Sequence, residues 1–356
     1  MAASALDSHD FGQIPGFMPE LGFGLQKAPL TMVVPDPLDE PGGEALLAAL
    51  RYLARMGVPV TLYTPRDDAP LQKRVEGLMA DGLLPGVSLA ARIAPPPEDQ
   101  GPLWWILESV KWRYPHQHIV AVSRNAFSGP DGAVVPLITG ETLETVADAA
   151  GFAPAVRREL SSTLAEMAPH HQRELRRLQV VAPEEIVPGL FTQNRVGTLI
   201  SRLAPRCAEC TPSDVRMLRA LADHQLLLPF PEAEDMAELA AVHDSFIKAV
   251  VDDARVPAGC LRVDRTAGRE PVAVVGSLAM AERYAGAEMA AALLRAAEGL
   301  GRAHNCQSII CPAGSEPLTT VLTERLGYAP LPPDSVPGGM SGTVYGKSLV
   351  EARAVI

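Results

Sequence analysis

The chain has 356 residues, enough for two domains, because a single hydrophobic core seldom grows beyond about 250–300 residues. Its 31 basic and 42 acidic residues give a formal net charge of −11, which repels phosphate backbones and argues against nucleic acid as a partner. There is no run of about eighteen apolar residues, and the first ten residues lack the charged-then-apolar order of a signal peptide, so we expect no membrane span and a cytoplasmic location.

The first domain is predicted to be α/β. Residues 1–27 lack periodicity and are rich in glycine and proline, so we expect an arm there. Residues 30–34 and 58–63 read as buried strands, and the leucines of residues 43–56 recur at helical spacing, with Gly57 placed to end the helix. Strand, helix and strand form the unit of a parallel sheet. We assign residues 28–204 to this domain.

The same alternation continues along the domain. We predict helices at residues 70–79 and 104–112 and in most of 139–174, and extended segments at 87–93, 118–122, 133–138 and 178–181. Residues 128–132 carry the glycines that a hairpin turn needs for positive φ. Trp104 and Trp105 fit a helix face in the core better than a stacking platform for a ligand.

A short polar segment divides the chain. Residues 205–214 are small, polar and interrupted by Pro212, so we expect a linker, with the second domain at residues 215–356. Cys207 and Cys210 form one C-x-x-C pair, but no second pair completes a tetrahedral zinc site, and we predict no metal. The odd number of cysteines, five, suits a reducing compartment.

The second domain begins with helical patterns and continues with strands. Helices are predicted at residues 215–228 and 236–246. The extended runs 259–264 and 272–280 flank a turn at 266–270, which predicts an antiparallel hairpin. An alanine-rich helix follows and reaches about His304.

The junction between the strand at 272–280 and this helix carries the strongest chemical signal. A strand that enters a helix through a turn of small residues exposes the first N–H groups and the positive end of the helix dipole, which together bind a pyrophosphate. Gly286 and Ala287 would let an anion reach these amides, and Arg283 could add charge at the rim. An ordinary β–α turn without a ligand is the alternative interpretation.

The order of elements around this junction resembles the GNAT acetyltransferases, and the resemblance implies an α+β fold for the second domain. The run 278–294, a strand at 306–310 and a helix at 318–325 ending in Leu326-Gly327-Tyr328 carry the resemblance. The family's turn, Q/R-x-x-G-x-G/A, corresponds to residues 283–288, with Glu288 where glycine or alanine is usual. The resemblance implies that acetyl-CoA binds with its pyrophosphate at the turn and its pantetheine arm along the preceding strand. The implied cofactor-binding residues are Leu278, Ala279, Met280, Arg283, Tyr284, Ala285, Gly286, Ala287, Glu288 and Met289.

Residues 180–200 are similar to the end of the amino-acid-kinase-like domain of N-acetylglutamate synthases, with Leu190-Phe191-Thr192 followed by a Gly-Thr-Leu-Ile segment at 197–200. Residues 118–138 resemble an earlier part of that domain, and the order of the two domains is the same. The resemblance implies transfer of acetyl from acetyl-CoA to L-glutamate, the entry step of arginine biosynthesis. It also implies a possible arginine effector and a homo-oligomer.

The phosphate-binding turns of an amino-acid kinase are replaced in this chain. Such a kinase has a Lys-Gly-Gly turn after its first strand and a glycine-rich turn after its second. Here the corresponding segments are Pro35-Asp36-Pro37 and residues 64–68. Proline offers no N–H and aspartate repels phosphate, so we predict that this domain phosphorylates nothing.

Acetyl transfer needs a base for the ammonium proton, and Glu270 and Glu282 are the candidates. Thr323 stands where many GNAT members have a tyrosine that protonates the departing thiolate. The carboxylates of an amino-acid substrate need cations, for which we consider Arg262, Arg269 and Lys347, with Ser348 beside it. Each of these charges can also be read as an ordinary surface residue.

Two other functions fit the same residues. The chain could acetylate a different small amine, with the first domain serving only for dimerisation. It could also be a non-catalytic regulatory paralogue that binds CoA or a partner enzyme, an interpretation that the missing kinase turns and Glu288 favour.

Overall fold

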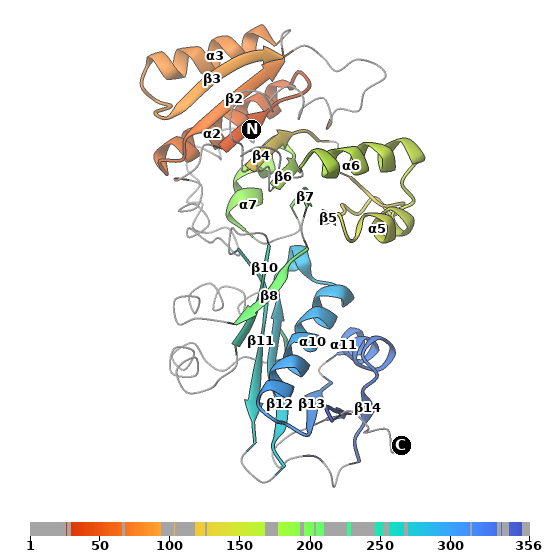
Figure 1. Cartoon of the computed structure of the whole chain (residues 1–356). Helices are drawn as coiled ribbons and strands as arrows, with labels where there is room; N and C mark the ends of the chain where they lie inside the picture. Colours follow the sequence, from red (N-terminus) through yellow and green to blue (C-terminus); the bar gives the residue numbers. More distant parts are fainter. Residues whose placement is uncertain are drawn as a thin grey trace. The chain divides into compact units, whose positions relative to one another are not determined.

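The computed structural model divides the chain into two compact units, Met1–Ala204 and Pro205–Ile356 (Figure 1). The structure describes residues 26, 30–65, 68–93, 103, 118–124, 127–167, 177–192, 196–202, 204–209, 226–228, 246–251, 256–266, 270–313, 315–332, 336 and 342–350. Each unit is built around one β-sheet.

The first unit contains a seven-stranded sheet in the order β3-β2-β1-β4-β6-β7-β5. All neighbouring strands pair in parallel except β6 and β7, which are antiparallel. The predicted α/β class is therefore confirmed. The strands are β1 (Leu30–Val33), β2 (Val60–Pro65), β3 (Val87–Ile93), β4 (His118–Val122), β5 (Leu137–Thr139), β6 (Arg177–Val181) and β7 (Thr198–Ser201).

In the first unit, capping residues and glycines mark the ends of the helices. In α2 (Glu40–Arg55) the Asp39 carboxylate accepts a hydrogen bond from the Gly42 N–H at 2.9 Å, and Gly57, with φ +70°, follows the helix end. The structure also describes α3 (Ala69–Ala80), α5 (Leu143–Ala149), α6 (Pro154–Glu166), the 3-10 turn η3 (Pro183–Glu185) and α7 (Ile186–Phe191) in this unit.

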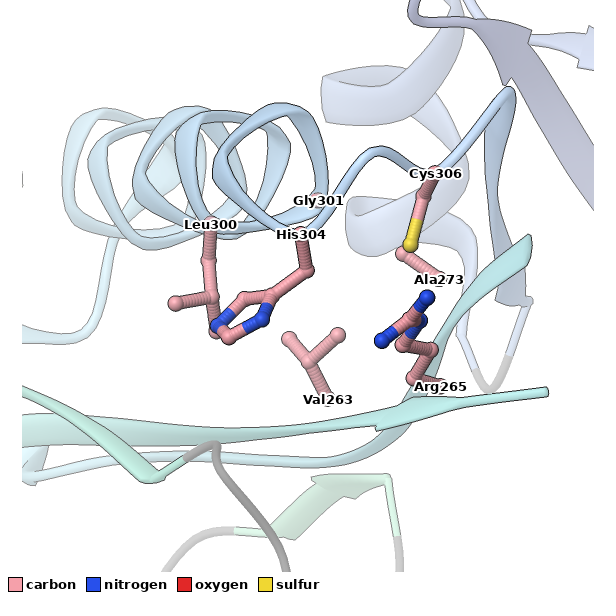
Figure 2. A pocket seen from close by; sticks show the side chains of 7 residues that line it. All are labelled: Val263, Arg265, Ala273, Leu300, Gly301, His304 and Cys306. Carbon is pink, nitrogen blue, oxygen red and sulfur yellow. The ribbon is translucent and has the colours of Figure 1, made fainter. Parts of the chain in front are cut away.

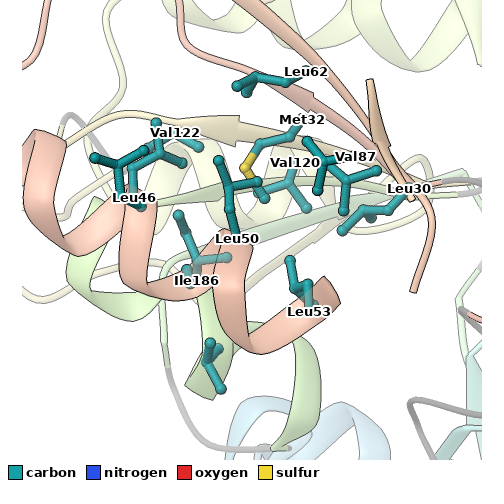
Figure 3. Close-up of a cluster of buried hydrophobic side chains, with 14 of the residues drawn as sticks. Leu30, Met32, Leu46, Leu50, Leu53, Leu62, Val87, Val120, Val122 and Ile186 are labelled. Atoms are coloured by element: carbon teal, nitrogen blue, oxygen red, sulfur yellow. The ribbon is translucent and has the colours of Figure 1, made fainter. Parts of the chain in front are cut away.

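Apolar side chains pack against both faces of this sheet. Figure 3 shows Leu46, Leu50 and Leu53 of α2, all fully buried, beside Met32 of β1 and Val120 of β4. The next residues along the same strands, Val33 and Ala121, belong to a second cluster with α5 and α6, as alternation along a strand requires. Burying each leucine of α2 contributes about 1.5–3 kcal/mol, which explains why the periodic pattern predicts this helix well.

The segments predicted at 118–122 and 133–138 do not pair with each other. The turn between them forms, because Ser128 makes a bridge with Val134 and Gly132 has φ +76°. However, β4 lies between β1 and β6, whereas β5 pairs with β7 at the edge of the sheet. Burial of strands on both faces decides this pairing, and the turn residues alone cannot show it.

The second unit contains an eight-stranded sheet in the order β14-β15-β13-β12-β11-β10-β8, with β9 also paired to β12. The pair β12–β13 is parallel and the other pairs are antiparallel. The predicted hairpin of 259–264 with 272–280 is confirmed as β11–β12. The strands are β8 (Arg206–Glu209), β9 (Leu226–Leu228), β10 (Phe246–Val251), β11 (Val256–Arg265), β12 (Val272–Met280), β13 (Ser308–Pro312), β14 (Ala329–Pro330) and β15 (Val344–Ser348).

The helix α10 (Ala287–Ala303) packs on this sheet along β11 and β12 (Figure 1). Its small residues let it lie close to the strands, and Leu293 reaches Gly259, where an added Cβ would be 3.0 Å from the leucine side chain. The 3-10 turn η6 (Glu282–Tyr284) precedes α10, and α11 (Glu316–Thr320) continues into the π-helical turn η7 (Val321–Arg325). In the described part of the chain, no helix is long and apolar enough to cross a membrane.

Some of the predictions for the segments around the domain boundary are wrong. The linker expected at 205–214 begins with strand β8, which pairs with β10, and the helix expected at 215–228 ends in strand β9. Edge pairing overrides local composition in both cases. The arm apart from Gln26, the helix expected at 104–112 and the helix expected at 236–246 apart from Phe246, which begins β10, lie outside the described residues.

Candidate functional site

At the junction of β12 and α10, the first backbone N–H groups of the helix have no acceptor within the helix. The first hydrogen bond of α10 runs from the Ala290 N–H to the Gly286 carbonyl at 3.1 Å, and no side chain caps the helix. The N–H groups of Ala287, Glu288 and Met289 therefore have no helical acceptor. A Cβ added at Gly286 would meet no atom within 4 Å, so the space in front of the turn is open. An uncapped helix of 17 residues facing open space is suited to bind an anion.

The edge of β12 that leads to this turn separates from β13. The two strands pair only at Val272–Val274 of β12, whereas β11 pairs with the other edge of β12 as far as Met280. Beyond Val274 this edge is used by β9, which pairs with Leu278 and Ala279. An extended ligand with amide groups could form the same backbone hydrogen bonds if it replaced β9.

Glu288, the second residue of α10, forms an ion pair with Arg325 at the end of η7. The Glu288 side chain is 66% exposed and the Arg325 side chain 41% exposed. Arg325 therefore holds the carboxylate at the surface and neutralises it. The backbone N–H of Glu288 stays available at the turn, as the predicted site requires.

Arg283 does not lie at the rim of the turn, contrary to the prediction. Its side chain is only 2% exposed, and that of the neighbouring Tyr284 is 4% exposed. The 3-10 geometry of η6 directs both residues into the protein, while Gly286 faces solvent. Arg283 and Tyr284 thus support the turn from inside. The residue pattern did not show which side of the turn each side chain would take.

Arg262 is held in place by Asp264, two residues along β11. The Arg262 Nε donates to the Asp264 Oδ1 at 2.9 Å, and the two side chains are 19% and 28% exposed. Gly276 of β12 makes room for the pair, because a Cβ there would lie 2.9 Å from the Asp264 Oδ2. Among the residues that the structure describes, the two Nη groups of Arg262 have no partner. They form a positioned fork for a carboxylate.

This arginine lies on the face of the sheet opposite to α10. Val263 faces α10, since it lines a pocket together with Leu300. Its neighbours Arg262 and Asp264 point to the other face, because side chains alternate along a strand.

Lys347 and Ser348 are engaged within the fold and are not free for a substrate, contrary to the prediction. The Lys347 Nζ donates to the Glu298 Oε1 at 2.9 Å, and the Glu298 side chain is only 5% exposed. Arg302 adds a second contact to Glu298 at 3.3 Å. The Ser348 hydroxyl donates to the Val350 carbonyl at 3.3 Å. Burial, and then the Glu298 charge, raise the pKa of the nearby Tyr328 hydroxyl far above its usual range.

The predicted acid and base residues are only partly brought together. Glu282 lies in η6, at the turn, and is half-buried. Glu270 is exposed before the start of β12, so the nine residues of that strand, about 30 Å at 3.3 Å each, separate it from the turn. The Thr323 hydroxyl donates to the Thr319 carbonyl at 3.0 Å, so its proton is used within its own helix. Arg269 lies outside the described residues.

A small pocket lies at the other end of α10, away from Gly286 (Figure 2). His304, Cys306 and Arg265 line it with apolar neighbours. Burial raises the pKa of the Cys306 thiol, and the Arg265 charge offsets this only in part. Burial also raises the pKa of Cys311 to about 12. Both thiols therefore stay protonated at neutral pH and are poor nucleophiles.

Sequence reasoning missed four residues of this region: Arg325, Asp264, Gly276 and Glu298. Only Asp264 carried a local signal, because a carboxylate two residues from Arg262 lies on the same face of a strand. In the described part of the chain, no cluster of three or more histidine, cysteine or carboxylate side chains is arranged to hold a metal ion.

No model of a known protein family matches the sequence, and no curated protein matches it. Among solved structures, N-acetylglutamate synthase from Neisseria gonorrhoeae complexed with coenzyme A and L-arginine is 14% identical, with a TM-score of 0.52 over 92% of this chain and 97% of that chain. The same enzyme with coenzyme A and N-acetyl-glutamate is 13% identical over 93% of this chain and 97% of that chain, with a TM-score of 0.37.

A GNAT acetyltransferase from Staphylococcus aureus Mu50 is 11% identical over 41% of this chain and all of that chain, with a TM-score of 0.35. The likeness to N-acetylglutamate synthase complexed with coenzyme A and L-arginine, at a TM-score of 0.52, concerns the fold. It shows that the chain shares the overall fold of that enzyme over 92% of its length, and the predicted resemblance is confirmed at the level of the fold.

Proposed function

We propose that this chain is an acetyl-CoA-dependent N-acetyltransferase, and that its acceptor is the amino group of L-glutamate. The observation that carries the proposal is the uncapped N-terminus of α10 beside the part of the β12 edge that does not pair with β13 and that β9 occupies. The overall fold, shared with N-acetylglutamate synthase, supports it.

The donor would bind along the turn. The diphosphate of acetyl-CoA would accept hydrogen bonds from the N–H groups of Ala287, Glu288 and Met289. Gly286 leaves the approach open, because no side chain stands in front of these amides. The amides of the pantetheine arm would pair with the backbone of Leu278 and Met280, as the GNAT resemblance implies. The thioester would then lie on the β12 edge, toward Val274.

The acceptor would be oriented by Arg262. Its two Nη groups, which have no partner among the described residues, match a carboxylate, and the Asp264 contact fixes their direction. The glutamate nitrogen attacks the thioester carbonyl, a C–N bond forms and the C–S bond breaks, and the second proton that the nitrogen loses passes through water to the departing CoA thiolate. Glu282, at the turn, is our candidate for accepting the ammonium proton, directly or through water. Positioning of the two substrates contributes most of the rate.

Steady-state kinetics with acetyl-CoA and a panel of amino acids tests this function. We expect CoA release with L-glutamate, and we expect Arg262→Met to raise the KM for glutamate by about tenfold to a hundredfold, because a charge-assisted bond contributes about 1.5–3 kcal/mol. The KM for acetyl-CoA should not change. Arg265→Met, an exposed cation on the same strand, is the matched control. No turnover with glutamate, or equal effects of the two variants, would contradict the assignment. Donor binding without turnover of any amine would support a regulatory paralogue instead.

Strand β9 and the pantetheine arm compete for the same backbone groups. Both would pair with the edge of β12 at Leu278, so β9 must leave when the donor binds. Leu228→Pro removes one N–H of β9 and disfavours its pairing, and should tighten CoA binding by about fivefold, equivalent to roughly one hydrogen bond. Leu228→Ala keeps the N–H and is the control. Calorimetric titration that found the proline variant to bind CoA no more tightly than this control would refute the competition.

Two helix N-termini of the first unit are relevant to its predicted lack of kinase activity. The helix N-termini of α2 and α3 are capped by Asp39 and Asp68, which accept from the Gly42 and Leu71 N–H groups at 2.9 and 3.2 Å. These carboxylates occupy the places where phosphates would bind, which supports the prediction that the unit phosphorylates nothing.

We propose L-arginine as an effector at this unit and a homo-oligomer as the assembly. Cytoplasmic location stays a prediction.

A further inference from the structure

The charge of Glu288 conflicts with an anion site at the turn. Glu288 is the second residue of α10, and its own backbone N–H is one of the groups proposed to hold the diphosphate. An unpaired carboxylate at this position would repel two phosphate charges over a distance of one side chain. At the effective dielectric of a protein surface, such a repulsion reduces affinity by roughly tenfold.

Arg325 is the cation that cancels this charge. It comes from the end of η7, 37 residues further along the chain, and its ion pair with Glu288 joins that helix to the first turn of α10. Arg283 of the turn is buried, and two cations further along the fold, Arg302 and Lys347, are paired with Glu298 instead. Within the described residues, neither Glu288 nor Arg325 has another ion-pair partner.

Folding stability does not explain the pair. Both side chains are well exposed, at 66% and 41%, and exposed ion pairs contribute little to stability in water. Its larger effect is on the local field at the N-terminus of α10, where the neighbouring groups are uncapped amides.

We infer that Arg325 is a positioning residue for the acetyl donor, which acts through Glu288 by holding its carboxylate at the surface and neutralising it, so that the turn can accept a diphosphate. This inference rests on the proposed function. It identifies the feature that compensates for a glutamate where GNAT proteins usually have glycine or alanine.

A double-mutant cycle tests the inference. The dissociation constant of CoA is measured by calorimetric titration at low ionic strength for the wild-type chain, Arg325→Met, Glu288→Gln and the double variant. We expect Arg325→Met to weaken CoA binding by about tenfold and Glu288→Gln to leave it unchanged or slightly tighter. In the Glu288→Gln background, Arg325→Met should change affinity by less than about twofold. The penalty should shrink at high salt, because the Debye length falls to about 3 Å at 1 M.

Two controls separate this effect from other causes. Pantetheine, which lacks the diphosphate, should bind the four proteins equally. Arg295→Met, which removes another exposed cation of α10, should not reproduce the loss. An equal penalty in both backgrounds, or no penalty at all, would overturn the inference while leaving the donor site in place. If the wild-type chain binds no CoA, the proposed function fails together with it.

Discussion

Replacing Gly286 with leucine is expected to weaken acetyl-CoA binding by about tenfold to a hundredfold. The leucine side chain would occupy the open space in front of the Ala287, Glu288 and Met289 amides and exclude the diphosphate. Each lost hydrogen bond to a charged group contributes about 1.5–3 kcal/mol, so the loss of one suffices for this effect. Calorimetric titration with CoA measures it directly.

The fold should tolerate this change. An added Cβ at Gly286 meets no atom within 4 Å, and the residue has φ 178°, an extended conformation open to any amino acid. Loss of a glycine N-cap costs at most about 1 kcal/mol. Gly299→Leu makes the same chemical change near the other end of α10, also in open space, and should leave CoA affinity unaltered. If Gly286→Leu binds CoA as tightly as Gly299→Leu does, the diphosphate does not lie at this turn.

Replacing Lys347 with methionine is expected to destabilise the second unit by about 2–4 kcal/mol, without raising the KM for glutamate. Glu298 is 5% exposed and receives a hydrogen bond from the Lys347 Nζ at 2.9 Å. Removing Lys347 leaves a buried carboxylate whose remaining ion pair, among the described residues, is the longer Arg302 contact at 3.3 Å. Breaking a buried ion pair in this way costs about 3–5 kcal/mol, and we discount this because Lys347 itself is 29% exposed.

Hydrogen exchange of peptides from α10 and β15 resolves this effect from the stability of the first unit. Both peptides should exchange faster in Lys347→Met. The double variant with Glu298→Met should recover much of the protection, because an apolar pair of similar volume leaves no buried charge. If Lys347→Met instead raises the KM for glutamate while exchange stays as in the wild type, Lys347 is a substrate ligand and the ion pair is incidental.

The local sequence predicts most of the elements that form the site. Leucines at helical spacing place α2, and the small-residue turn before an alanine-rich stretch places the junction of β12 and α10. The polar turn around residues 266–270 predicts the β11–β12 hairpin. These features depend on residues within about one helix or one hairpin of each other, so periodicity and turn chemistry are sufficient to find them.

Contacts between distant segments decide the remaining features. Strand β9 can pair with β12 because β13 leaves that part of the β12 edge unpaired. Local composition does not contain this information, so the end of 215–228 was wrongly predicted to be helical. The burial of Arg283 depends on the direction of a single 3-10 turn. Two ion pairs of this unit, Glu288 with Arg325 and Glu298 with Lys347, join residues 37 and 49 positions apart.

The sequence by itself predicted an α/β unit followed by an α+β unit, showed that the phosphate-binding turns of a kinase are replaced in the first, and located the turn at Gly286 where a strand leads into a helix. Only the tertiary structure decided which charged side chains lie at the turn and which form ion pairs elsewhere in the fold. The physical reason is that secondary structure follows from neighbours along the chain, whereas the partner of a charged side chain is set by packing between elements. Hence Lys347 is found beside Glu298, and Arg325 beside Glu288.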